Sequence, residues 1–437
     1  MTAPRLPNLF KVPELKEKIL FTLLCLVVYR VGAHIATPGV NVQALADYLK
    51  NQAQGTLFSL YDLFAGGSFG RATVFALGIM PYISASIVFQ LAAPVFPVVE
   101  KMQRDEEGRK KLTQWTRYLT VVLCLFQAYG YALFTEQIAG AVAHPGFFFR
   151  LTTVLTLTTG GVFVMWLGEQ ITERGIGNGA SLLIFFSIVE RIWPETIRTV
   201  EALQARSLSV PTLLAVLTVM VLVVAGTVAV TVAARRIPIQ IPRKVMGRGR
   251  IREGQKTFIP LRLNTANVMP IIFAQSLIIV PGTIAAFSGN QTLKHLADYF
   301  SVTSPAYLIS NVVLIIFFAY FYTSIIFNPV DLAENLKKQG GFIPGVKPGA
   351  ATADYIDEVL SRITFPGALF LTVVAMLPIV VSNILGMPFG FGGTALLIVV
   401  GVALDTVQQV QQHLLLRHYD GFMKEGRVKF RGRQRYM

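Results

Sequence analysis

The sequence predicts an all-α polytopic membrane protein with ten transmembrane helices. Of its 437 residues 53% are hydrophobic and only 14% are charged, and the mean hydropathy is +0.56. A water-soluble globular protein carries about 25% charged residues, and disordered chains have low hydrophobicity. The composition therefore excludes both classes and leaves a chain that crosses a membrane several times, with a net charge of +15.

Apolar runs of membrane length define the expected spans, because a helix needs about 20 apolar residues to cross about 30 Å of hydrocarbon. We expect spans at 19–36, 72–93, 118–135, 150–168, 180–193, 211–234, 264–287, 306–328, 366–385 and 395–416. The first run lacks a small-residue cleavage site and ends in Thr37-Pro38-Gly39. We therefore expect it to stay as the first span rather than to be a cleaved signal peptide.

Basic residues fall mainly on one side of the predicted membrane. They gather in the N-terminal segment, in the 2–3, 6–7 and 8–9 loops and in the C-terminal tail. Positively charged loops near span ends are retained in the cytoplasm, so we expect these segments and both termini to be cytoplasmic. The bases expected on the opposite side are Lys50, Arg150, Arg191, Arg198, Arg206 and Lys294.

A short apolar segment lies between spans 1 and 2. Residues 56–65 are followed by Gly66-Gly67 and Gly70. The segment is too short to span and too apolar for a solvated loop, and non-helical backbone at membrane depth requires surrounding protein or a water-filled cavity. Two interpretations remain open, a re-entrant segment with a glycine hinge and an interfacial helix on the outer surface.

Two predicted helices that lie five spans apart share a Met-Pro motif near their start. Met80-Pro81 opens the body of span 2, and Met269-Pro270 opens that of span 7. Repeated, broken helices in corresponding positions of two halves are typical of a pathway at the repeat interface. Within span 2, Ile79, Ile83 and Ile87 share one helix face. Their spacing alone indicates a packing or lipid-facing stripe.

Ionisable residues at membrane depth are candidate functional groups because a charge there is costly. Arg30 and Asp405 lie inside spans, and Arg71 lies at a boundary. We expect Arg30 to bond backbone carbonyls of a broken neighbouring helix and Asp405 to be solvated in the cytoplasmic half of span 10. An ion-coupled secondary transporter is the alternative function, but it would need several acidic residues near the midplane.

Motifs for catalysis, cofactors or metals are not found in the sequence. Cys25 and Cys124 lie in apolar runs without CxxC spacing, and the five histidines are scattered. Nothing resembles a nucleotide-hydrolysis motif. We therefore expect no enzyme activity, no cofactor and no metal site, and any energy for transport must come from partners.

Four longer strings resemble the SecY family. They are WLGEQITERGIGNG at 166–179, FALGIMPYI at 75–83, FIPGVKPG at 342–349, and FGGT at 391–394 followed by LLIVV at 396–400. The resemblance covers essentially the whole chain in order. It implies the central subunit of a protein-conducting channel in the bacterial plasma membrane, with two pseudo-symmetric five-helix halves around a central pore and a lateral gate between spans 2 and 7.

The resemblance also divides the chain into segments. They are a cytoplasmic N-terminus (1–18), an N-terminal half (19–193) with a re-entrant plug (56–70), an outer hinge loop (194–210), a C-terminal half (211–416) with docking loops at 235–263 and 329–362, and a basic tail (417–437).

Site residues follow from the same resemblance. The implied pore ring is Ile79, Ile83, Ala180, Ile184, Ile272 and Ile398, and the implied plug includes Leu57, Leu60, Leu63, Phe64, Gly66 and Gly67. Ser84, Gln127 and Asn264 are the expected polar contacts of the lateral gate. Ala180 departs from the bulkier residue usual in the family, so we expect the plug to carry more of the seal.

The basic loops have two interpretations. Attraction to anionic lipid headgroups would be served by any basic loop, whereas the family uses these loops to dock ribosomal RNA phosphates and the SecA ATPase. The expected docking residues are Arg235, Arg236, Arg243, Lys244, Arg248, Arg250 and Lys347. Lys347 replaces the usual arginine and lacks its planar fork. Other implied partners are small SecE-type and SecG-type membrane subunits, signal peptides and nascent chains.

Overall fold

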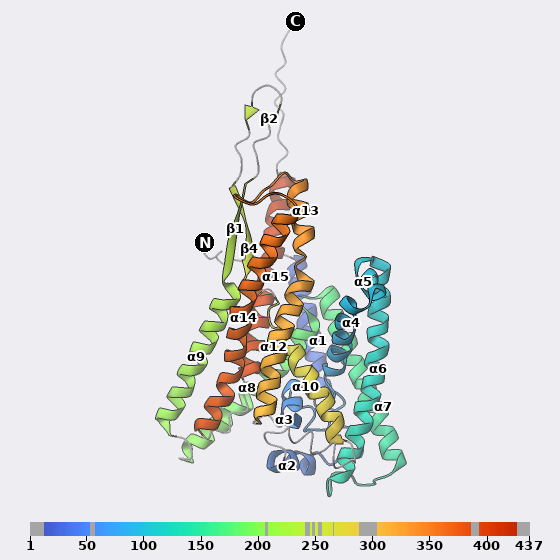
Figure 1. Ribbon diagram of the computed structural model, residues 1–437. Coiled ribbons are helices and arrows are strands. Elements are labelled where there is room, and N and C mark those ends of the chain that lie inside the picture. The colour runs from blue at the N-terminus through green and yellow to red at the C-terminus, as the bar shows by residue number, and fades with distance from the viewer. Residues whose placement is uncertain are drawn as a thin grey trace.

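The computed structural model describes residues 13–52, 57–205, 209–240, 245–246, 250–251, 256–264, 266–287, 304–385 and 393–425. Long helices form a bundle, and a β-hairpin stands at one end of it (Figure 1). The helices over the expected spans are α1 (Pro13–Gly32), α4 (Met80–Val95), α6 (Glu106–Gln137), α7 (Phe147–Arg174), α8 (Gly179–Gln204), α9 (Val210–Val232), α10 (Met269–Phe287), α12 (Pro305–Ile326), α14 (Ala350–Leu385) and α15 (Gly393–Glu425).

Each expected span overlaps one of these helices, which supports the all-α membrane fold. By length and apolar composition, six helices of the described residues could cross a membrane, namely α6, α7, α9, α12, α14 and α15. α4 qualifies only together with α5 (Pro97–Arg104), and the two are bent by 112° at their junction. α1 and α8 do not meet the criterion, and the apolar part of α10, Met269–Thr283, is shorter than the criterion requires. The number ten therefore stays a prediction.

Span 2 begins later than the apolar run predicts. Residues 65–79 form turns and α4 starts only at Met80. Gly78 has φ +56°, a left-handed conformation that favours glycine, and Pro81 lies in the first turn of α4, where its missing N–H breaks no helical bond. Hydropathy alone could not separate this apolar turn from the helix.

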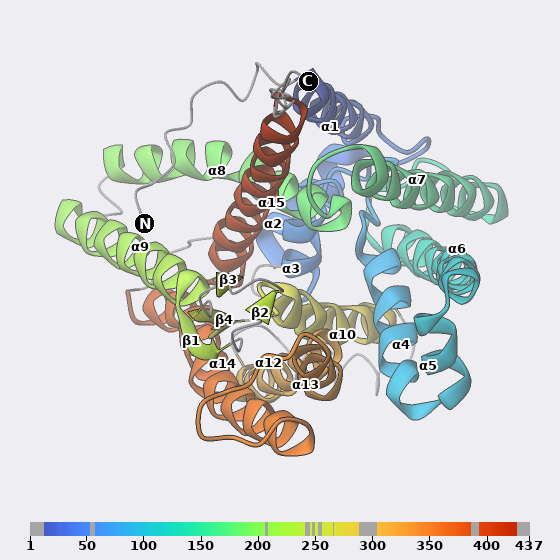
Figure 2. The ribbon, with the colours of Figure 1, turned by 90° about the horizontal axis from the view of Figure 1, so that it is seen from above.

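The paired Met-Pro motifs begin two helices that lie in contact. α4 begins at Met80 and α10 at Met269, each with a proline next. Ser276 Oγ of α10 lies 4.0 Å from Met80 Sδ of α4. Figure 2 shows α4 and α10 on adjoining sides of the bundle.

Shorter elements lie at the two ends of the bundle. α2 (Val42–Gln52) and α3 (Leu57–Phe64) lie toward one end, and α5, α13 (Pro329–Lys338) and the strands lie toward the other (Figure 1). β1 (Ala234–Gln240) pairs antiparallel with β4 (Lys256–Arg262), in register from Ala234 with Arg262 to Gln240 with Lys256. β2 (Val245–Met246) pairs antiparallel with β3 (Arg250–Ile251).

The hairpin has its own hydrophobic core, separate from that of the bundle. Ile237 and Ile239 alternate inward along β1 and pack with Leu261 of β4 against α13 and α14. Gln240 and Phe342 exchange backbone hydrogen bonds of 2.9 and 3.0 Å. The segments expected as the 6–7 and 8–9 loops therefore form one packed unit.

Candidate functional site

The expected ring positions come together in the core of the bundle. They lie at the start of α4, in the first two turns of α8, in the first turn of α10 and near the start of α15. Ile79, Ile83, Ile184, Ile272 and Ile398 are each less than 5% exposed and belong to one apolar cluster. Ala180 is half-buried and packs against that cluster. Ile87 belongs to the same cluster.

A small cavity adjoins these residues. It has a volume of about 190 Å³ and is lined by four ring positions, Ile83, Ala180, Ile184 and Ile272. The remaining lining is largely polar and includes Ser86, Gln90, Thr172, Asn178, Ser181 and Tyr322. Apolar ring positions therefore border a cavity whose other walls are largely polar.

Helix α3, the expected plug helix, is buried against the same cluster. Leu60, Leu63 and Phe64 are 8%, 3% and 1% exposed and belong to the core that contains the ring positions. A helix lying on the outer surface would leave one face open to headgroups. The burial of α3 therefore favours the re-entrant interpretation. The side chain of Leu57 lies outside the described residues.

The glycine turn after α3 packs closely on α8. Gly66 and Gly67 have φ +65° and +77°, a region that L side chains rarely adopt. A Cβ at Gly66 would also lie 3.1 Å from Cβ of Ser187. Glycine is thus required here both by conformation and by space.

Polar and aromatic contacts fix α3 in place. The Tyr61 hydroxyl donates to the carbonyl of Leu77 at 2.9 Å and to Gln127 Oε1 at 3.3 Å. Asp62 forms an ion pair with Arg191 of α8 at 3.1 Å. Phe58 stacks on Phe134 of α6, with ring centroids 4.7 Å apart. The expected plug is therefore bonded to α6 and to α8 by side chains of different kinds.

Charged residues surround the side of α3 that faces away from the ring. A cavity of about 440 Å³ there is lined by Asp62, Gly66, Gly67 and several charged side chains of α1 and α8. Arg71 donates to the carbonyls of Gly66 and Gly67 at 2.9 and 3.1 Å and pairs with Glu190 at 3.2 Å.

Arg30 also pairs with Glu190. Our prediction that Arg30 bonds the carbonyls of a broken segment was wrong, because that task falls to Arg71. From the sequence, either Arg30 or Arg71 could have bonded these backbone carbonyls. Only the fold shows that Arg71 lies beside the glycine turn.

The three expected gate residues each have a hydrogen-bond partner other than one another. The Ser84 hydroxyl donates to Met80 within its own helix, at 3.0 Å. Gln127 is 1% exposed and accepts from Tyr61 of α3. Asn264 Nδ2 donates to the carbonyl of Asn267 at 2.9 Å, in the connection that leads into α10.

A polar contact between the two halves occurs elsewhere. The Tyr322 hydroxyl of α12 donates to Gln90 Oε1 of α4 at 2.7 Å, and both residues line the smaller cavity. Gln90 was visible in the sequence as a polar residue of span 2, but no sequence signal pointed to Tyr322 as its partner.

Comparison with known families decides what this arrangement is. The family model for SecY matches residues 73–407, which include all six ring positions. The chain belongs to the SecY family. The transmembrane helices and this membership make it a multi-pass membrane protein.

Relatives in the SecY family cover nearly the whole chain. Protein translocase subunit SecY of Aquifex aeolicus is 45% identical over 96% of this chain and 99% of its own length. The subunits of Thermus thermophilus and Escherichia coli K12 are 44% and 42% identical over 97% and 96% of this chain and 98% and 96% of their own lengths.

Solved structures share the SecY-family fold at lower identity. One described as the structure of a protein conducting channel has a TM-score of 0.66 and 19% identity, with 98% of this chain and 100% of that chain covered. Sec61 in the canine ribosome-channel complex has a TM-score of 0.62 and 18% identity, with the same coverage.

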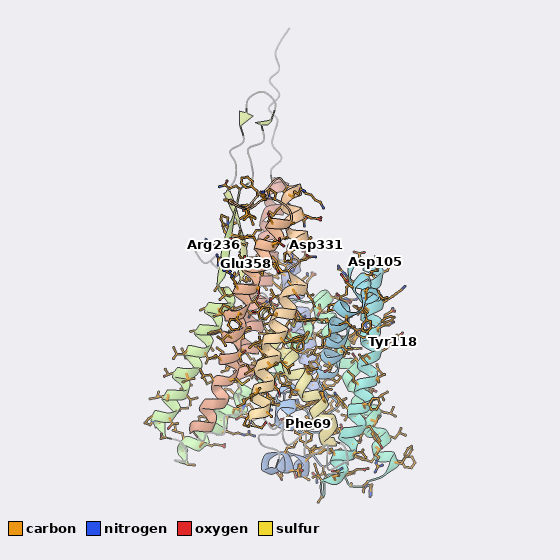
Figure 3. All side chains as sticks on the ribbon, viewed as in Figure 1. Phe69, Asp105, Tyr118, Arg236, Asp331 and Glu358 are labelled. Carbon is orange, nitrogen blue, oxygen red and sulfur yellow. The ribbon has the colours of Figure 1, made fainter. Side chains whose placement is uncertain are left out.

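The basic residues expected to dock partners of a SecY-family channel are described only in part, and Arg235, Arg236 and Lys347 lie at the hairpin end. Arg235 and Arg236 are exposed on β1, and Arg236 lies 4.8 Å above the ring of Phe258. Lys347 is exposed in the segment before α14. Arg250 lies in β3, and Arg243, Lys244 and Arg248 lie outside the described residues. Figure 3 shows Arg236, Asp331, Glu358 and Asp105 toward this end and Phe69 toward the other.

Metal-binding groups are not found among the residues that the structure describes. They contain no group of three or more His, Cys, Asp or Glu side chains close enough to hold an ion. Cys25 and Cys124 are both buried with free thiols.

Proposed function

We propose that this chain is the central subunit of a protein translocase. It forms a channel through which unfolded secretory polypeptides cross the bacterial plasma membrane, and it releases transmembrane segments sideways into the lipid. The observation that carries the proposal is the burial of α3 against an apolar ring cluster, in a chain whose SecY-family relatives are named protein translocase subunits. Both termini lie in the cytoplasm, as the distribution of Lys and Arg supports.

The ring and the plug together seal the channel at rest. A narrow apolar collar dewets and blocks ions, yet it offers a passing extended chain no strong binding site. The half-buried Ala180 leaves one side of the collar less filled, so α3 supplies part of the seal. Displacing α3 into the charged cavity around Arg71 and Glu190 would open the path.

The seam between α4 and α10 serves as the lateral gate. Met80 and Ser276 meet across it, and Gln90 and Tyr322 bond nearby between α4 and α12. An apolar signal peptide that enters the seam loses contact with water, and removal of apolar area from water drives this step. The gate is stabilised by weak polar contacts of Ser84, Gln127 and Asn264. Gln127 acts through its hydrogen bond to Tyr61 of the plug.

Energy and docking come from partners, because the sequence holds no motif for nucleotide hydrolysis and the chain is not an enzyme. The SecA ATPase and the ribosome dock on the basic hairpin and on Lys347, and SecE-type and SecG-type subunits complete the channel. A ribosome complex of Sec61, which shares the fold, supports the ribosome as a partner. Anionic lipids bind the remaining basic residues.

A transporter function lacks a supporting observation. Asp405, the acidic residue predicted inside a span, accepts a hydrogen bond from Asn267 rather than contacting other acids. Ion coupling needs several such groups near the midplane.

Deletion of residues 57–67 tests the proposed seal. The purified channel is reconstituted into planar bilayers and its resting ion conductance is measured. We expect a marked rise, because the collar loses the helix that packs against it. A deletion of equal length at 241–251, in the docking hairpin, is the control and should leave the conductance at the wild-type level. Unchanged conductance in the 57–67 deletion would contradict the plug assignment.

A further inference from the structure

A short connection joins the docking hairpin to helix α10. β4 ends at Arg262 and α10 begins at Met269, and the structure describes all of the residues between them except residue 265. A peptide chain extends by at most about 3.5 Å per residue. A displacement of the hairpin that exceeds the slack in this connection must therefore move α10 as well.

Helix α15 holds this connection at both of its ends. Arg262 Nη1 donates to Gln408 Oε1 at 2.7 Å, and Asn267 Nδ2 donates to Asp405 Oδ1 at 3.1 Å. Asp405 and Gln408 lie on the same face of α15, because they are three residues apart. We call Arg262, Asn267, Asp405 and Gln408 the α15 clasp.

Close packing extends this contact by one more turn. A side chain at Gly401, which precedes Asp405 by four residues on the same face, would collide with Val268. Val268 is 6% exposed and belongs to the bundle core. The connection therefore lies directly on α15 over about two turns.

Asn267 has a backbone conformation that needs external support. Its φ is +52°, and among the described residues only Ala72 is another non-glycine with positive φ. Asparagine tolerates this region better than most residues, and such conformations persist where their surroundings fix them. Asn267 is fixed from both sides, because its carbonyl accepts from Asn264 and its side chain donates to Asp405.

The carboxylate of Asp405 is unfavourable for simple packing of α15 against the connection. Asp405 is half-buried, and burying a charge is costly unless it is paired. Arg262 is its electrostatic partner. Well-packed apolar side chains often match or exceed the stability of a buried ionic network, so the network indicates a positioning task beyond packing.

We propose that Asp405 is a positioning residue that passes movement of the docking hairpin to helix α10. The clasp joins the hairpin to two ring positions, because Ile272 lies in the first turn of α10 and Ile398 lies about two turns before Asp405. A partner that moves the hairpin thereby shifts the start of the gate helix. This proposal rests on the function proposed above.

Kinetics of SecA-driven translocation in proteoliposomes test the clasp. In Asp405→Ala we expect kcat to fall about tenfold, within the range of allosteric coupling, with an unchanged KM for SecA because the docking surface is intact. Asp405→Asn keeps the acceptor oxygen and should retain a kcat within about twofold of wild type, since the hydrogen bond and the turn survive. Asn267→Gly keeps the turn and removes the side-chain bond, so it should behave like Asp405→Ala.

Amide hydrogen exchange of residues 263–268 adds a readout that needs no activity. We expect faster exchange in Asp405→Ala and Asn267→Gly, and wild-type exchange in Asp405→Asn. Wild-type kcat or wild-type exchange in Asn267→Gly would overturn the clasp, as would a rise in KM alone, and this comparison holds even if Asp405→Ala does not fold. Failure of the wild-type channel to translocate would instead refute the proposed function.

Discussion

Tyr61 joins the plug helix to α6 through one hydroxyl group. It is 2% exposed and bonds both the Leu77 carbonyl and the side chain of Gln127. Gln127 was expected to act in the gate, and the structure gives it a partner in the expected plug instead. Gln127 uses its amide oxygen for this bond, and its Nε2 has no hydrogen-bond partner among the residues that the structure describes.

Replacement of Tyr61 by Phe should loosen the plug with little change in packing. A lost buried hydrogen bond costs about 1 kcal/mol, which corresponds to an approximately fivefold larger population of the displaced plug. We expect the resting conductance to rise by about that factor. Tyr307→Phe is the matched control, because it removes a buried hydroxyl bond to Gln275 at 3.0 Å, which joins α12 to α10 and involves no residue of α3. Equal conductance in the two variants would refute the role of Tyr61.

At the residue scale, the sequence predicted which residues share a helix face better than it predicted which residues contact each other. The i, i+4 spacing of Ile79, Ile83 and Ile87 predicted one shared face, and all three lie in the bundle core. The ion pair of Asp62 with Arg191 could not be predicted, because it joins residues 129 positions apart. Only the fold brings α3 against α8.

Among the elements, α3, the proposed plug helix, is joined to α8 by this ion pair. Asp62 and Arg191 have side chains 18% and 25% exposed, and Asp62 also accepts from the Gly70 amide at 2.8 Å. The pair thus ties α8 both to α3 and to the glycine turn that follows it.

Charge exchange at this pair provides an element-scale test. Asp62→Arg should raise resting conductance, because it places two cations together beside Arg71. The double variant Asp62→Arg with Arg191→Asp should lower the resting conductance most of the way back to the wild-type level, because it restores an ion pair. A partly exposed ion pair stabilises by up to about 1 kcal/mol. Single-channel recording compares the two. A double variant as leaky as Asp62→Arg would show that the pair does not orient the plug.

The sequence predicted where the long helices lie better than it predicted the residues at which they begin. Apolar runs located every long helix, but α6 and α14 extend well before the runs at 118 and 366, to Glu106 and Ala350. These extensions contain charged residues, so a hydropathy criterion does not include them in a span. The hairpin of β1 and β4 was expected only as a basic loop, because the alternation of apolar and polar residues that indicates a strand covers few residues there.

Across the whole molecule, positive charge is unevenly distributed along the sequence. The net charge of +15 is concentrated in segments that we place in the cytoplasm. Because the hairpin packs on α13 and α14 through its own core, Arg235, Arg236 and Lys347 are carried by one packed unit. Such a unit suits large anionic partners better than independent flexible loops would.

Reversal of charge at Arg235, Arg236 and Lys347 to Glu should weaken SecA or ribosome binding. Each lost phosphate or carboxylate contact lowers affinity and flattens the dependence on salt. Binding is measured in detergent, where lipid attraction is absent, at two salt concentrations. Arg198→Glu, on the opposite side, should bind normally. Persistent binding by the triple variant would leave these residues as headgroup anchors only.

The most direct test of a channel with a lateral gate is translocation through a gate that can be locked. Met80→Cys and Ser276→Cys place one thiol on α4 and one on α10, near the contact in which Met80 Sδ and Ser276 Oγ lie 4.0 Å apart. A disulfide between these thiols, verified by mass, would join the two helices. Protease protection of a secretory precursor is followed in proteoliposomes that contain this chain, its small subunits, SecA and ATP. We expect protection with the reduced variant, none after oxidation, and recovery on reduction. Full protection with the oxidised, verified disulfide would contradict the account.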